Sequence, residues 1–107
     1  MHKEARTYRA PDGSAPFEDW VDQLKDTVGR IKIRVRLRRV MQGNLGDYRP
    51  IGSGIIELRI DFGPGYRLYA GLHGPEVIVI LCGGDKKSQK QDIAAAHGYW
   101  DDYKRRL

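Results

Sequence analysis

Residues 55–61 alternate between apolar and charged side chains, the period-2 pattern of a strand with one buried face. A Gly-Pro-Gly turn at 63–65 leads to a second strand over residues 66–72. The run Val77–Cys82 is apolar on both faces, which is typical of a central strand. The short connections between these segments predict an antiparallel meander of three strands.

Three further elements are expected outside the meander. Residues 4–9 are predicted as a first strand. Ser14 is a candidate N-cap for a helix that ends at residue 24 or 25. Residues 87–105 repeat apolar side chains at helical spacing, so we expect an amphipathic helix there, with Ser88 and Gln91 as a capping box.

Residues 27–42 fit either a strand or a helix. Apolar residues alternate with basic ones over 31–37, which is a strand pattern rich in β-branched side chains. On a helix the segment would carry two apolar stripes and would suit a place between a neighbouring helix and a sheet; the stripes are Val28/Ile31/Val35 and Ile33/Leu37/Val40. The residues alone favour neither structure for this segment. With either structure, the order of elements along the whole chain indicates an α+β protein.

The chain has 107 residues, the length of one small domain, and we expect a single domain over 1–107. The longest apolar run is far shorter than the roughly 20 residues of a membrane span. No secretory signal is visible in residues 1–20. The only cysteine, Cys82, cannot form an internal disulfide, and no Cys/His set has zinc-site spacing. We therefore expect a cytoplasmic protein without a structural metal.

Basic residues outnumber acidic ones and are clustered. The formal net charge is +5. Six basic residues and no acid fall within residues 30–39, and a second cluster is formed by Lys86, Lys87 and Lys90. Clustered positive charge attracts polyanions, chiefly nucleic acid, although a solvated surface or an acidic protein partner would also explain it.

The meander predicts one polar face. Glu57, Arg59 and Asp61 share a face of the first strand, and Arg67 and Tyr69 share a face of the next. Two outward arginines beside a carboxylate and a phenol would suit a phosphate clamp. Cross-strand ion pairing on a solvated sheet face would explain the same residues. The loop 83–88 also resembles a phosphate-binding turn before a helix, without the spacing of a nucleotide triphosphatase loop.

Several blocks of the sequence resemble one family. The segment IELRIDFGPGYRLY at 56–69 is similar to the signature of HigB-like addiction-module killer proteins, which are phage-related members of the RelE/ParE toxin superfamily. LCGGDKKSQKQDI at 81–93 is similar to the next block of that family, and Tyr99-Trp100 to the end of its last helix. GNLGD at 43–47 and PIG at 50–52 also fit, so the resemblance covers nearly the whole chain.

The resemblance implies a RelE/ParE-like α+β fold of order β-α-α-β-β-β-α. A small, curved, mainly antiparallel sheet would pack against two N-terminal helices and a C-terminal helix, so residues 27–42 are taken as helical. It implies a toxin of a type II toxin-antitoxin system, neutralised by a cognate helix-turn-helix antitoxin (HigA-like) and reaching operator DNA only through that antitoxin. No membrane partner is implied.

The usual activity of HigB-like proteins is cleavage of messenger RNA on the ribosome. Other branches of the superfamily inhibit DNA gyrase, and an inactive prophage remnant that only binds its antitoxin is a third alternative. Cleavage would be a metal-independent attack of a ribose 2′-hydroxyl on the adjacent phosphate, with no cofactor.

The resemblance also suggests which residues act. Arg59 and Arg67 match basic positions of the superfamily, Glu57 is the candidate base, and Tyr69 or Lys86 is the candidate acid. The residues expected to bind RNA or the ribosome are Arg30, Arg34, Arg38, Lys87 and Lys90, although the basic segment would equally suit an acidic antitoxin. Better-known ribosome-dependent relatives end near the last strand with a catalytic Tyr or His, whereas here a helix is expected to follow.

Overall fold

The computed structural model of the protein describes residues 3–107. Its helices and strands are, in chain order, β1 (Glu4–Thr7), α1 (Pro16–Gln23), α2 (Thr27–Met41), β2 (Tyr48–Pro50), β3 (Ile55–Ile60), β4 (Tyr66–His73), β5 (Val77–Gly84) and α3 (Gln89–Arg105). The chain is an α+β protein, and the predicted first strand, meander and last helix are all present.

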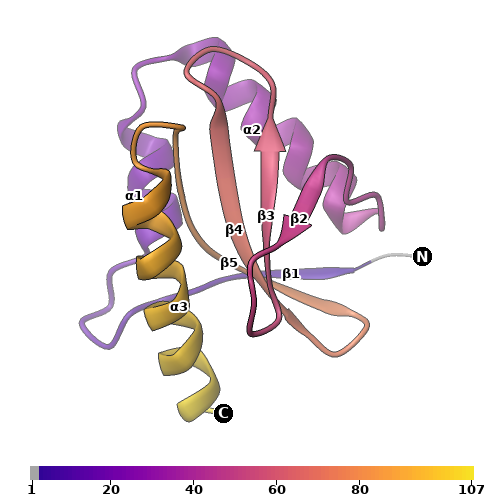
Figure 1. The fold of residues 1–107 in the computed structure, drawn as a ribbon, viewed down its shortest axis with the longest axis vertical. Coiled ribbons are helices and arrows are strands. Elements are labelled where there is room, and N and C mark those ends of the chain that lie inside the picture. The colour runs from indigo at the N-terminus through magenta and orange to yellow at the C-terminus, as the bar shows by residue number, and fades with distance from the viewer. Residues whose placement is uncertain (1–2) are drawn as a thin grey trace.

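The strands form one open mixed sheet of five strands in the order β1-β5-β4-β3-β2. The meander β3–β4–β5 is antiparallel, as predicted, and β1 pairs with β5 in parallel. Figure 1 shows α1 and α2 behind the sheet and α3 in front of it. The prediction of two N-terminal helices on one side of a mainly antiparallel sheet is confirmed.

Each face of the sheet has its own core. Ile56, Leu58 and Leu68 face α1 and α2, where they pack with Phe17 and Ile33. On the other face, Ile55, Tyr69, Val79 and Leu81 pack under α3 with Ala96 and Trp100. Because both faces are covered, the alternation of β3 does not separate a buried face from a solvated one.

α2 is formed by the segment whose sequence pattern fitted both a strand and a helix. It is a helix because Asp26 caps it, accepting a hydrogen bond from the Gly29 N–H (2.9 Å), and because Ile33 and Val40 meet the sheet one above the other. The stripe that begins with Val28 and Ile31 is not packed between two elements, because Val28 is 52% exposed and Ile31 57%. The idea that both stripes are buried was therefore wrong.

β2 was not predicted, so the order of elements has one strand more than expected. Its three residues are exposed and show no alternation. They pair with β3 in antiparallel register, Tyr48 opposite Leu58 and Arg49 opposite Glu57. A strand this short is formed by the edge that β3 offers rather than by its own sequence.

Two expected helix caps are also absent. The N-cap of α1 is Ala15, and the Ser14 hydroxyl donates instead to Asp12. Ser88 is the N-cap residue of α3, but its hydroxyl donates to Asp92 rather than joining a capping box with Gln91. Both serines bond to a nearby carboxylate, which competes with the helix backbone for the same hydroxyl.

Packing of α3 on the sheet depends on Gly71. A Cβ at this position would overlap the Trp100 ring, because the backbone of β4 lies directly beneath the indole. We expect Gly71→Ala to lower the free energy of unfolding by about 1–3 kcal/mol, the usual cost of overpacking. Urea unfolding followed by circular dichroism measures it.

Gly98 is the matched control for that substitution. It lies in α3 with nothing within 4 Å of an added Cβ. Gly98→Ala should raise stability by about 0.5–1 kcal/mol, as expected for glycine in a helix interior. Equal effects of the two substitutions would show that Trp100 does not pack on Gly71 as described.

Candidate functional site

Two arginines face each other across the β3–β4 hairpin. Arg59 and Arg67 are direct partners in the antiparallel register. Like charges directly opposite one another destabilise a sheet. The pair is therefore a feature that the fold alone does not favour, and nearby anionic groups must offset its charge.

Glu57 is the anion beneath this pair, and it is completely buried. Its carboxylate accepts hydrogen bonds from Arg49 Nε (2.9 Å), Gln89 Nε2 (2.9 Å) and the Tyr69 hydroxyl (3.1 Å). Arg67 Nε lies 3.8 Å from Glu57 Oε2, close enough for charge attraction but not for a hydrogen bond. Glu57 thus joins β2, β3, β4 and α3 in one network.

The network shifts the pKa values of the Glu57 carboxyl group and the Tyr69 hydroxyl group. Burial alone would raise the pKa of Glu57, but the hydrogen bonds from Gln89, Arg49 and Tyr69 outweigh it and hold that pKa below its usual value. Burial, together with the neighbouring Glu57 charge, raises the pKa of the Tyr69 hydroxyl far above its usual value. Glu57 is therefore a stable anion and Tyr69 a very weak acid.

The expectation of a solvated polar face needs correction here. Glu57 and Tyr69 are both fully buried, because the first turn of α3 covers them and places Gln89 on Glu57. Arg67 is largely buried, with 13% of its side chain exposed. A polar residue in an alternating strand indicates only which face it lies on, not whether another element covers that face.

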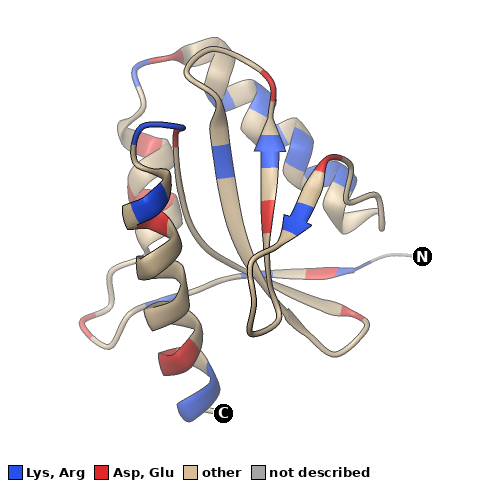
Figure 2. Cartoon of the chain, in the orientation of Figure 1, with Lys and Arg blue, Asp and Glu red and all other residues tan. Residues whose placement is uncertain are grey.

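Beyond the cover of α3, the hairpin opens into a cleft of about 380 Å³, which we call the clamp cleft. Arg59, Arg67 and Lys86 line it, together with Asp47 and Asp61. Basic positions in β3, in β4 and in the loop before α3 lie toward the same end of the sheet (Figure 2). The sequence-predicted residues Arg59, Arg67 and Lys86 are therefore brought together.

The charges in the clamp cleft are only loosely paired. Arg59 donates to Asp47 Oδ1 at 3.1 Å, but both side chains are about half exposed, at 42% and 60%. Exposed ion pairs of this kind contribute little stability, so an incoming anion can replace Asp47 at small cost. Three cations around one open cleft suit a phosphodiester.

Arg36 holds one wall of the clamp cleft in place. Its guanidinium reaches from α2 and donates to the carbonyl oxygens of Arg59 (2.5 Å), Leu45 (2.8 Å) and Asp47 (2.6 Å). The sequence shows Arg36 only as one of the clustered basic residues of 30–39, which would suit a polyanion, a solvated surface or an acidic partner. The structure gives it a different role, because it ties the loop before β2 to the end of β3.

We expect Arg36→Ala to lower the free energy of unfolding by about 1–3 kcal/mol, since it leaves carbonyl groups without a donor. Hydrogen exchange should report the local effect, with faster exchange of the Arg59 amide, which donates to the Asp47 carbonyl. Arg38→Ala, an exposed position on the same helix, is the control. An unchanged rate of hydrogen exchange at the Arg59 amide in the Arg36→Ala variant would show that Arg36 does not hold the loop before β2 against the end of β3.

The loop 83–88 does not offer free amides to a phosphate. The Asp85 carboxylate already accepts from the N–H groups of Lys87 (2.9 Å) and Ser88 (3.1 Å). An anion supplied by the chain itself thus occupies the place that a phosphate would take. The likeness to a phosphate-binding turn was misleading, and what the loop contributes to the clamp cleft is the Lys86 side chain.

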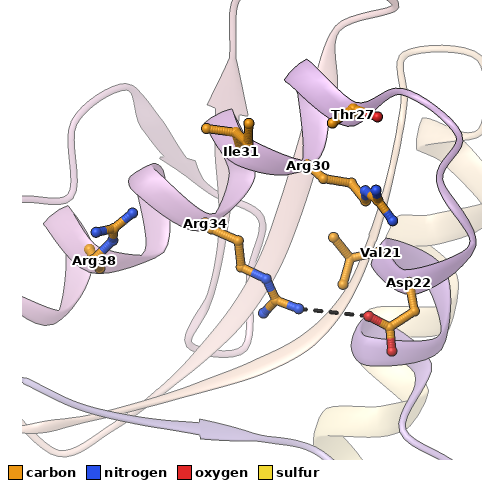
Figure 3. Close-up of a pocket in the computed structure, with 7 residues that line it drawn as sticks. All are labelled: Val21, Asp22, Thr27, Arg30, Ile31, Arg34 and Arg38. Carbon is orange, nitrogen blue, oxygen red and sulfur yellow. Dashed lines mark ion pairs between the residues drawn. The ribbon is translucent and has the colours of Figure 1, made fainter.

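Other expected binding residues lie elsewhere. Arg30, Arg34 and Arg38 follow one side of α2 and line a groove against α1, and Arg34 pairs there with Glu18 (3.1 Å) and Asp22 (3.9 Å) (Figure 3). The lining residues of this groove and of the clamp cleft have no member in common. Lys87, in the loop before α3, and Lys90, in the first turn of α3, are exposed and are also outside the lining of the clamp cleft.

Sequence reasoning missed several residues that shape the site. They are Arg36, Asp47, Arg49, Asp61 as a cleft-lining carboxylate, and Gln89. Recognising β2 would have placed Arg49 beside Glu57, and Asp47, the residue before that strand, beside Arg59. No local signal marks Gln89, whose role depends on where α3 lies.

Cys82 lies outside the lining of the clamp cleft. Cys82 is buried, and burial raises the pKa of its thiol to about 12, so it is an unreactive core residue as expected. Within residues 3–107, no three His, Cys, Asp or Glu side chains are grouped so that they could hold a metal ion. In the same part of the chain, no helix has the length and apolar character needed to cross a membrane.

Fold and site together define a small α+β protein with an arginine pair above a buried glutamate and a basic cleft at one end of its sheet. No protein-family model matches the chain. An uncharacterized protein from Haemophilus influenzae is 42% identical over 80 residues, which cover 75% of this chain and 81% of that protein. The chain belongs to the same family as this Haemophilus influenzae protein.

Proposed function

We propose that the protein is a toxin of a type II toxin-antitoxin system, of the HigB-like branch of the RelE/ParE superfamily, and that it cleaves messenger RNA on the ribosome. The arginine pair Arg59/Arg67, open to one cleft with Lys86, is the observation that carries this proposal. The arrangement of helices around the sheet is compatible with the RelE/ParE-like fold, with β2 as an added edge strand.

In this proposal, Arg59 and Arg67 hold the scissile phosphate and stabilise the charge that develops on it. The ribose 2′-oxygen forms a bond to phosphorus and its proton passes to a carboxylate, while the bond from phosphorus to the 5′-oxygen breaks. The products are a 2′,3′-cyclic phosphate and a 5′-hydroxyl group. No metal is required for this step.

The positions of the acids and bases refine the assignment of roles. Glu57 and Tyr69 are buried and bonded to one another, so we assign both to positioning Arg67 rather than to proton transfer. Asp61 is an exposed carboxylate that lines the clamp cleft, and we assign it as the base. Lys86, exposed in the same cleft, is the group that protonates the leaving 5′-oxygen.

The partners follow from the same proposal. They are the ribosome with its mRNA, and a cognate helix-turn-helix antitoxin that neutralises the toxin and alone contacts operator DNA. We place the active toxin in the cytoplasm, where translation occurs.

Induced expression in a bacterial host, with mapping of transcript 5′ ends, tests the proposal. We expect growth arrest and new 5′ ends within translated regions, in register with codons. Arrest with intact transcripts and DNA damage would instead favour a gyrase inhibitor. Absence of arrest would favour a remnant that only binds its antitoxin.

A further inference from the structure

A second cleft adjoins the clamp cleft. It lies between α2 and the end of β3, has a volume of about 390 Å³, and shares Ile60 and Asp61 with the clamp cleft. We call it the α2–β3 cleft. We propose that it binds the nucleotide next to the clamped phosphate in single-stranded RNA, an inference that rests on the proposed function.

The walls of the α2–β3 cleft are suited to a nucleobase. Phe62 forms part of the lining and is only partly buried, and Ile31 and Val35 of α2 stand beside it. Single-stranded nucleic acid is bound largely by bases lying on aromatic and apolar side chains next to a basic surface. The volume falls within the range of small-ligand pockets, about 300–1,000 Å³.

Cations at the rim of the cleft are suited to the RNA backbone. The Lys32 ammonium lies 4.9 Å from the centroid of the Phe62 ring, and Arg39 lines the same cleft about two helical turns along α2. Both side chains are exposed. Arg36 lies between them, but its guanidinium is committed to backbone carbonyls. Lys32 and Arg39 are therefore the pair available to a phosphate.

The α2–β3 cleft adjoins the clamp cleft, and this favours RNA over an acidic protein segment as its occupant. Both clefts have Ile60 and Asp61 in their lining, so they adjoin at the end of β3. In this inference, a strand whose phosphate lies between Arg59 and Arg67 continues past these two residues into the α2–β3 cleft. By contrast, Arg30 and Arg34 extend toward α1, as Figure 3 shows, and Arg38 lines the same groove. α2 thus carries two basic rows, of which only the row with Lys32 and Arg39 adjoins the phosphate clamp.

The test compares a dinucleotide with a tetranucleotide of 2′-O-methyl RNA, in which the attacking hydroxyl is blocked. Fluorescence anisotropy of the labelled oligonucleotides gives their affinities for the full chain. Lys32→Ala/Arg39→Ala should weaken tetranucleotide binding about 10-fold and dinucleotide binding less than about 2-fold, because only the longer ligand reaches the second cleft.

Lys104→Ala/Arg105→Ala is the matched control, since it removes one lysine and one arginine from exposed positions on α3. It should change neither affinity by more than about 2-fold. Equal losses in both double variants would show that only net charge matters and would overturn the inference. Circular dichroism and urea unfolding check that all variants remain folded.

Three further outcomes distinguish failure of this inference from failure of the proposed function. If the wild type binds both oligonucleotides equally well, the α2–β3 cleft holds no nucleotide, while the clamp is unaffected. If neither oligonucleotide binds, both the clamp and the inference fail. A polyglutamate peptide that binds through Lys32 and Arg39 while the tetranucleotide does not would assign the cleft to an acidic protein.

Discussion

Replacement of Arg67 by alanine is expected to lower RNA cleavage about 10²–10³-fold while the fold is retained. Arg67 faces Arg59 across the hairpin and is held by Glu57 and by the Gly65 carbonyl, to which its Nη1 donates at 2.9 Å. Its removal takes away one of the two arginines that we propose to hold the phosphate. Glu57 keeps its three hydrogen-bond donors, so the buried network remains satisfied.

Cleavage is measured by primer extension on mRNA translated by purified ribosomes in the presence of purified protein. Arg67→Lys should retain part of the activity, because lysine keeps the charge but not the two-pronged geometry of arginine. Arg105→Ala, at an exposed position near the end of α3, is the control and should cleave like the wild type. Undiminished cleavage by a folded Arg67→Ala protein would refute the clamp.

Replacement of Glu57 by alanine is expected to cost about 3–5 kcal/mol of stability, the largest effect that we predict for a single residue. The substitution leaves the buried Tyr69 hydroxyl and the Gln89 amide without their acceptor, and leaves Arg49 and Arg67 without their counter-charge. Urea unfolding followed by circular dichroism measures the loss. A loss in the free energy of unfolding below about 1 kcal/mol would show that the hydrogen bonds and ion pairs of Glu57 do not stabilise the fold as described.

Glu57→Gln tests the charge separately from the hydrogen bonds. Because the folded pKa of Glu57 lies below its usual value of about 4.3, its charge adds stability above that pH, and this contribution disappears as the pH falls through the folded pKa. The wild type should therefore lose more stability than Glu57→Gln between about pH 5 and the acid limit. If the stability of the wild type and of Glu57→Gln fell in parallel with pH, the charge of Glu57 would contribute nothing to stability.

The β3–β4 hairpin shows how far sequence reasoning reaches. Its alternation and its Gly-Pro-Gly turn predicted both strands and put Arg59 and Arg67 on one polar face, whereas the register that sets the two arginines opposite one another came from the structure. These are local properties, since side chains alternate along a strand and a short turn aligns two strands. The two arginines of the clamp cleft were accordingly predictable before the fold was known, whereas the place of Lys86 beside them depends on where the loop before α3 lies.

α2 and β2 show where local information ends. The pattern of residues 27–42 satisfies both the strand and the helix periods, and the choice follows from Ile33 and Val40 meeting the sheet and from the Asp26 cap. β2 has no pattern of its own and forms because β3 presents a free edge. In both cases a distant partner decides the structure.

The sequence alone predicted an α+β fold, an antiparallel meander at its centre and a basic hairpin that carries arginines. These features were predictable because they depend on residues that are neighbours along the chain. Only the tertiary structure decided that Glu57 and Tyr69 are buried beneath α3, that Arg36 holds the loop before β2, and that two clefts join at the end of β3. Burial and clefts arise where separate elements meet, and no local pattern records which elements those are.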